Sequence, residues 1–124
     1  MVLDASALLA LLNAEPGAGT VERALPEAVI SAVNLSETVA KLTDIGVPEA
    51  EAWQAAADLV PVVVDFDAEA ARQCAKLRVA TREHGLSFGD RACLALARRL
   101  RLPVLTADRA WRKLSLGIEI RYLR

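Results

Sequence analysis

Four acidic residues are candidates for chemistry because of the pattern around each of them. Asp4 directly follows a short apolar run, and Asp108 comes three residues after another. Asp90 ends the tetrapeptide S-x-x-D, a pattern typical of the first turn of a helix. Glu37 stands within an otherwise apolar helical pattern. Since ligands of open α/β sheets bind beyond the carboxyl ends of the strands, these acids predict a site at that edge.

Each acid also has an ordinary structural explanation. Asp4 can be the cap of the helix that follows it, and Asp108 can be the cap of a short later helix. Asp90 can serve only as the acidic member of a capping box. Glu37 lies four residues before Lys41, so that a surface ion pair on one helix accounts for it.

Four carboxylates at one edge would repel one another, and a divalent cation is the natural resolution. Oxygen ligands without histidine or cysteine favour Mg²⁺ or Mn²⁺ over Zn²⁺. Such an ion activates water and stabilises the leaving oxygen in phosphodiester cleavage. Ser6 and Thr106 each lie two residues from an acid. Their hydroxyls are predicted to orient Asp4 and Asp108 or to bind a metal-bound water, with turn and capping chemistry as the alternative.

Short apolar runs alternate with helical patterns along the whole chain. This alternation predicts one domain over residues 1–124, a three-layer α/β/α sandwich with a central, mainly parallel sheet. Strands are predicted at residues 2–3, 28–30, 62–64, 104–105 and 118–120. Helices are predicted at residues 6–13, 19–25, 31–44, 48–59, 68–83, 87–100 and 110–114.

Composition narrows the function classes. The chain has 124 residues, 54% of them hydrophobic, which favours a well-buried core. No apolar run approaches the roughly 18 residues of a membrane span, and no basic segment precedes the first apolar run, so we expect a cytoplasmic protein.

The net charge is −1, but the basic residues gather in the second half, where together they can face phosphates. Cys74 and Cys93 are expected to be small core residues without a disulfide.

The ordered set of short motifs resembles a known family. D-x-S begins at Asp4, S-x-x-N-L-S-E-like text spans Ser31–Glu37, L-S-F-G-D spans Leu86–Asp90 and L-T-A-D spans Leu105–Asp108. Together they resemble the PIN domain, and more closely the VapC toxins of prokaryotic toxin–antitoxin pairs. Each tetrapeptide alone is a weak signal, but the ordered set extends over the full length from Met1 to Arg124.

The resemblance implies a Mg²⁺- or Mn²⁺-dependent endoribonuclease that leaves a 5′-phosphate and a 3′-hydroxyl. Its acidic quartet would be Asp4, Glu37, Asp90 and Asp108, the last at the family's more variable position. Three of the acids would hold the metal, while Glu37 completes the shell or orients the attacking water. The resemblance also implies a homodimer and an antitoxin that blocks the active site. Arg91 and Arg109 each directly follow an acid of the quartet. They can clamp phosphate, unless the helix geometry turns them away.

Three other interpretations stay open at this point. One is a PIN-domain nuclease that processes RNA and is not a toxin, and another is a PIN relative that only binds RNA or a partner. The third is a phospho-acceptor receiver module, which also gathers acids and Mg²⁺ at strand ends. A receiver needs paired acids after its first strand and a lysine after its fifth, whereas Asp4 stands alone and no such lysine is present.

Overall fold

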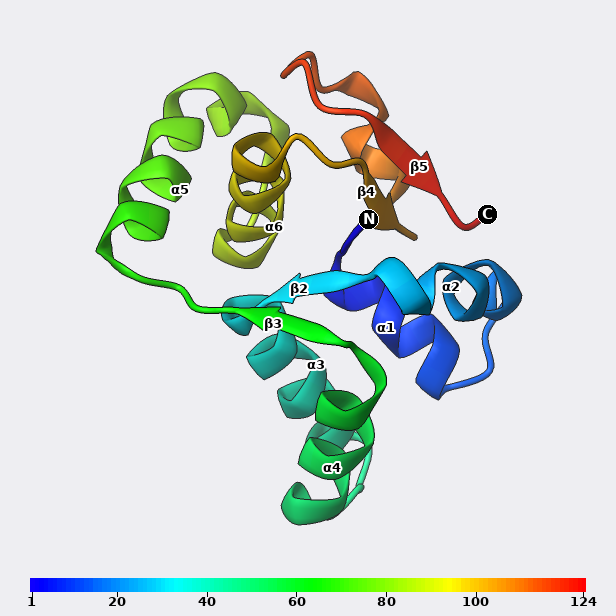
Figure 1. The fold of residues 1–124 in the computed structure, drawn as a ribbon. Coiled ribbons are helices and arrows are strands. Elements are labelled where there is room, and N and C mark those ends of the chain that lie inside the picture. The colour runs from blue at the N-terminus through cyan, green and yellow to red at the C-terminus, as the bar shows by residue number, and fades with distance from the viewer.

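A five-stranded sheet, parallel throughout, forms the centre of the protein (Figure 1). The computed structural model describes all residues from 1 to 124. The strand order is β3-β2-β1-β4-β5, so the first strand lies in the middle of the sheet. The strands are β1 (Val2–Leu3), β2 (Val29–Ser31), β3 (Val62–Val64), β4 (Val104–Thr106) and β5 (Ile120–Tyr122).

The strands are short, and the side chains of the central strands β1 and β4 alternate between two cores. Val2 pairs with Val104 and Leu3 with Leu105 across β1 and β4. The two valines belong to one hydrophobic cluster and the two leucines to the other. This is the two-residue period of a strand, with both faces covered. The predicted three-layer sandwich is confirmed.

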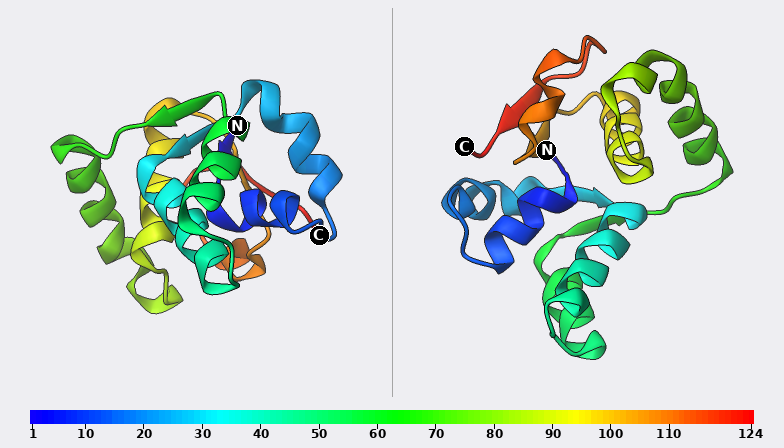
Figure 2. Two further views of the ribbon diagram at one scale, coloured as in Figure 1. Left: turned by 90° about the horizontal axis from the view of Figure 1, so that it is seen from below. Right: turned by 180° about the vertical axis from the view of Figure 1, so that it is seen from behind.

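Helices cover both faces (Figure 1). The core that contains Leu3 is closed by α1 (Ala5–Leu12), α2 (Ala18–Ala24), the 3₁₀ turn η1 (Leu25–Glu27), α3 (Ala32–Asp44) and α4 (Glu49–Leu59). The core that contains Val2 is closed by α5 (Ala68–Thr81), α6 (Phe88–Leu100) and the 3₁₀ helix η3 (Arg109–Lys113), with η2 (Arg82–His84) joining α5 to α6. Figure 2 shows the C-terminus beside α2 and the loop that leads into it, where Arg124 forms an ion pair with Glu15 at 3.1 Å.

Several helix starts follow from local capping chemistry. The Asp67 carboxylate accepts a hydrogen bond from the Ala70 amide at 2.9 Å and caps α5. Ser87 and Asp90 form the predicted reciprocal capping box at the start of α6. Both helices therefore begin where the sequence predicts, because the signal lies within four residues.

Other predicted boundaries were wrong. The last strand is Ile120–Tyr122 rather than residues 118–120. The helix predicted for residues 68–83 ends as an α-helix at Thr81 and continues as η2, and residues 109–113 form a 3₁₀ helix. Cys74 and Cys93 are buried and free, as expected. None of the helices combines the length and the apolar character that crossing a membrane requires.

Candidate active site

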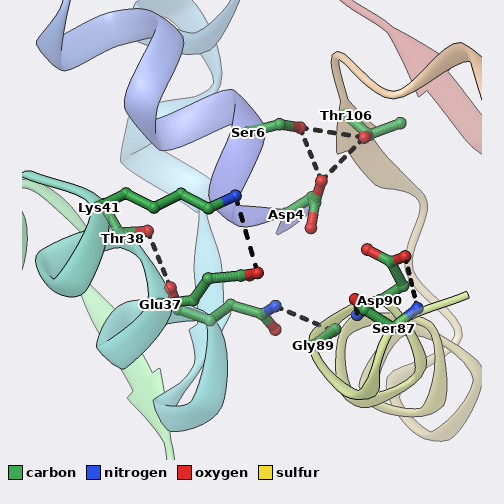
Figure 3. A network of polar contacts seen from close by, with 10 residues as sticks. Asp4, Ser6, Glu37, Thr38, Lys41, Ser87, Gly89, Asp90 and Thr106 are labelled. Atoms are coloured by element: carbon green, nitrogen blue, oxygen red, sulfur yellow. Dashed lines mark hydrogen bonds and ion pairs between the residues drawn. The ribbon is translucent and has the colours of Figure 1, made fainter. Parts of the chain in front are cut away.

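Asp4 lies at the end of the central strand β1 and is only 4% exposed. It occupies the N-cap position of α1, yet its side chain makes no capping hydrogen bond. Instead, its Oδ2 accepts hydrogen bonds from the Ser6 hydroxyl at 2.6 Å and the Thr106 hydroxyl at 3.0 Å (Figure 3). The explanation of Asp4 as a helix cap is therefore wrong.

The two hydroxyls are themselves fixed by the backbone after β4. Ser6 Oγ accepts from the amide of Ala107 at 2.9 Å, and Thr106 Oγ1 accepts from the amide of Asp108 at 3.0 Å. Each hydroxyl oxygen accepts an amide proton through a lone pair. Its own proton therefore remains available for a hydrogen bond to Asp4. The network thus locks the orientation of the Asp4 carboxylate between the ends of β1 and β4.

The electrostatics of Asp4 favour its neutral form. Burial raises the pKa of Asp4 from 3.8 to about 6, the hydrogen bonds from Ser6 and Thr106 lower it, and the charges of Asp90 and Glu37 raise it again. No lysine or arginine forms an ion pair with Asp4. The site holds a buried acid beside two further acids, and no cationic side chain forms an ion pair with Asp4 itself.

Asp90 is held by its own helix. Its Oδ2 accepts from the Ser87 amide at 3.0 Å, and its amide donates to the Ser87 hydroxyl at 3.1 Å. Figure 3 shows the Asp90 carboxylate on the side of α6 that faces Asp4. The capping box therefore fixes this acid and still leaves one carboxylate oxygen without a protein partner, so that structural and chemical roles coexist in one residue.

Glu37 approaches the same space from the second turn of α3. Its side chain is 29% exposed, and its Oε2 lies 3.9 Å from Lys41 Nζ, so the expected ion pair is present (Figure 3). The pair is long and half open to solvent, which makes it weak. It leaves Glu37 available for another partner.

Two residues that belong to the quoted motifs, but for which the sequence indicates no role, join α3 to α6. The buried Asn34 amide donates to the carbonyl of Gly89 at 3.0 Å. A Cβ on Gly89 would lie 2.9 Å from Glu37 Oε1, so only glycine lets Glu37 pass this closely. The one feature of the sequence that points to this contact is Asn34 itself, whose amide side chain lies three residues before Glu37 on the same face of the helix.

Asp108 makes its hydrogen bond with the short helix that follows it. Its Oδ1 accepts from the Ala110 amide at 2.9 Å and caps η3, as the structural alternative predicted. The charges that raise the pKa of Asp4 are those of Asp90 and Glu37, whereas Asp108 contributes, after burial, to raising the pKa of Tyr122. Asp4, Glu37 and Asp90 therefore form the shared acidic space, with Asp108 at its border.

The two candidate phosphate clamps do not contact the acids. The Arg91 guanidinium donates to the carbonyl of Cys74 at 3.4 Å and lies 5.9 Å from the centre of the Phe88 ring. Arg109 donates to the carbonyl of Arg124 at 2.8 Å. Both side chains are held by other parts of the protein.

The donor set is chemically suited to a hard divalent cation, because it offers carboxylate oxygens without histidine or cysteine. No group of three acidic, histidine or cysteine side chains is placed to ligate one ion together. Mg²⁺ usually retains several waters and takes one or two carboxylates directly. The residues therefore fit this ion with water in part of its shell.

A parallel sheet that carries acids beyond its central strands defines the class to which this protein belongs. The PIN domain matches residues 1–116, which places the chain in the PIN-domain family. Within that family it is a member of the VapC ribonuclease toxins. It is 33% identical to the Ribonuclease VapC of Mycolicibacterium smegmatis over 121 residues, which cover 90% of this chain and 94% of the relative.

Solved structures agree with this assignment. VapC20 of Mycobacterium tuberculosis, a sarcin–ricin loop cleaving toxin, superposes with a TM-score of 0.69 at 25% identity, covering 86% of this chain and 88% of that protein. The DNA-bound VapBC structure from Salmonella typhimurium has a TM-score of 0.75 at 19% identity and covers 99% of this chain and 97% of its own. At 19% identity, the similarity to the Salmonella typhimurium structure shows a shared fold only.

Proposed function

We propose that this protein cleaves RNA as the metal-dependent toxin of a toxin–antitoxin pair, with Asp4, Glu37, Asp90 and Asp108 as its site residues. The observation that carries the proposal is the Asp4 carboxylate, which is buried, oriented by two hydroxyls, near two other acids and without a cationic side chain. A buried charge without a partner is costly. A site built this way is electrostatically incomplete until a cation enters it.

Mg²⁺ or Mn²⁺ is the proposed cation. Asp4 and Asp90 would hold it, with Asp108 and Glu37 contributing directly or through water. When bound, the ion supplies Lewis-acid polarisation of a phosphate oxygen and lowers the pKa of a bound water. The donor chemistry supports this choice, because oxygen ligands alone select these ions over Zn²⁺.

The side chains of the protein have distinct roles in this proposal. Ser6 and Thr106 oppose the effect of burial, since hydrogen bonds to a carboxylate favour its ionised form. Asp90 presents a carboxylate that its capping box keeps in one orientation. Glu37 is partly exposed and is suited to accept a hydrogen bond from the attacking water. In-line attack then leaves a 5′-phosphate and a 3′-hydroxyl.

The proposed partners are an RNA substrate, an antitoxin and a second copy of the chain in a homodimer, all in the cytoplasm. Support for the antitoxin comes from similar folds solved as toxin–antitoxin complexes, from Klebsiella pneumoniae and Rickettsia felis among others. An antitoxin segment that covers the acidic space would block access of RNA to Asp4 and Asp90.

Induction of the gene tests the biological part of the proposal. We expect the protein alone to arrest growth, the product of the neighbouring reading frame to relieve the arrest, and Asp4→Asn to abolish it. We also expect purified protein to cleave RNA with Mg²⁺ or Mn²⁺ and to stop when the metal is chelated. Metal-dependent cleavage without growth arrest would identify an RNA-processing nuclease instead. Cleavage that persists after chelation would contradict the metal assignment.

A further inference from the structure

An apolar groove adjoins the acidic space between the first turns of α3 and α6. Its volume is about 490 Å³. Glu37 and Gly89 line it together with Phe66 and Phe88, so the groove is continuous with the site. Phe88 begins α6, two residues before Asp90, and is 51% exposed.

The Phe88 ring is half exposed but not free to move. Phe66 packs against it edge to face, with 5.5 Å between the ring centres and an interplanar angle of 85°. The Arg91 guanidinium lies 5.9 Å from its centre. These are the favoured geometries of aromatic and cation–π contacts. They hold the ring in place while half of its surface stays open to solvent.

Three of the α3 residues that line the groove have small side chains, namely Ala32, Val33 and Ser36. A flat group can therefore lie against Phe88 without displacing a bulky neighbour. A large exposed aromatic ring at the border of a site is more informative than one scattered on a surface.

An acidic site also has an electrostatic difficulty with RNA. The acids Asp4, Glu37 and Asp90 offset the charge of the proposed cation. Lys41 pairs with Glu37, and neither Arg91 nor Arg109 contacts the acids. Affinity for the nucleotides next to the cleaved bond must then come in part from contacts that do not depend on charge. Stacking of bases on aromatic rings is such a contact and is the usual way in which proteins hold unpaired RNA.

We propose that Phe88, held in place by Phe66, is a platform on which an unpaired base of the RNA substrate stacks, beside the phosphodiester bond that water cleaves at the acidic site. The inference rests on the proposed ribonuclease function and adds a binding residue to it. Because every base has a flat face, this contact favours unpaired over paired RNA without selecting a sequence.

Substitution of Phe88 tests the platform. Phe88→Ala and Phe88→Leu, the second of which keeps an apolar side chain against Phe66, should raise KM for single-stranded RNA of randomised sequence on the order of tenfold, the effect of one stacked base. Phe88→Trp should keep the wild-type KM. The matched control is Trp53→Ala on α4, an aromatic residue that is 49% exposed and outside the groove, which should change nothing.

Binding without cleavage gives an independent readout. In the Asp90→Asn background, a randomised RNA oligonucleotide that carries 2-aminopurine should lose fluorescence on binding, because stacking quenches this base. Phe88→Leu should remove the quenching and weaken binding about tenfold. Circular dichroism should show that the Phe88 variants remain folded.

The outcomes separate this inference from the function on which it rests. If the wild-type protein neither binds nor cleaves RNA, both fail. If it cleaves RNA and Phe88→Leu leaves KM and quenching unchanged, only the stacking platform is refuted. The platform is equally refuted if Phe88→Leu spares RNA binding but weakens the antitoxin complex or dissociates a dimer, since the groove would then belong to a protein partner.

Discussion

Replacing Asp4 with asparagine should stabilise the metal-free protein at neutral pH. The carboxylate is buried, and its pKa in the folded protein is about 6 rather than the ordinary 3.8. The folded state therefore binds the proton more tightly than the unfolded state. Stability contributed by this group is fully present below the ordinary pKa and is lost as the pH rises through the folded value. Asparagine keeps the shape and the acceptor oxygen but has no charge to bury.

The magnitude follows from the shift of about two pKa units at about 1.4 kcal/mol each, which gives an upper value of about 3 kcal/mol. With a pKa of 3.8 in the unfolded state and about 6 in the folded state, ionisation of Asp4 should lower the free energy of unfolding of the wild-type protein. The loss should be about 3 kcal/mol at pH ~8 and about 1 kcal/mol at pH ~4.5. The free energy of unfolding of Asp4→Asn relative to wild type should therefore increase by about 2 kcal/mol between these two pH values.

Urea denaturation in EDTA at both pH values measures this difference. Carboxylates that do not interact with Asp4 contribute equally in both proteins, so the comparison isolates Asp4 together with its charge interactions with Asp90 and Glu37. Asp67→Asn is the matched control, because Asp67 is exposed, caps α5 and keeps its cap as asparagine. If the stability of Asp4→Asn relative to wild type is the same at both pH values, the argument that burial destabilises the ionised form of Asp4 is refuted.

Three further predictions concern the surroundings of Asp4. Millimolar Mg²⁺ should raise the unfolding temperature of wild type but not of Asp4→Asn, measured by calorimetry, and an equal rise in both would contradict binding at Asp4. Gly89→Ala should lower cleavage activity with the fold retained by circular dichroism, because its Cβ would push the flexible Glu37 carboxylate aside; full activity would show that this contact is unimportant. Thr106→Val removes a hydrogen bond that lowers the pKa of Asp4, so the acidic limb of the pH–activity profile should move to higher pH, and an unchanged limb would oppose this role.

Local signals in the sequence predicted those features that depend on neighbours along the chain. The capping box of Ser87 and Asp90 and the cap at Asp67 are contained within four residues. The parallel sheet and the alternation of strands with helices were also predicted correctly.

Features set by distant contacts were not visible in the sequence. The last strand was misplaced because Ile118-Glu119-Ile120 has the better apolar alternation, whereas pairing with β4 selects Ile120–Tyr122. Asn34 and Gly89 are 55 positions apart, and only the packing of α3 on α6 brings them together. Periodicity describes a single element and does not identify the contacts that one element makes with another.

Asp108 illustrates the remaining ambiguity. Its position after β4 predicts a site acid, and its hydrogen bond to Ala110 also makes it a helix cap. Asp90 has the same double nature, but it faces Asp4. Whether a capping acid also takes part in chemistry depends on the direction in which its second oxygen points, and this direction is a property of the folded chain.

Cleavage of RNA by Asp90→Asn is the most direct test of the acidic site. Asparagine can still accept the hydrogen bond from Ser87, so α6 should keep its start and the circular dichroism spectrum should not change. We predict that Asp90→Asn has no detectable cleavage with Mg²⁺ or Mn²⁺, while the Asp67→Asn control retains wild-type activity. Wild-type cleavage by a folded Asp90→Asn protein would contradict the central claim that these carboxylates perform the reaction.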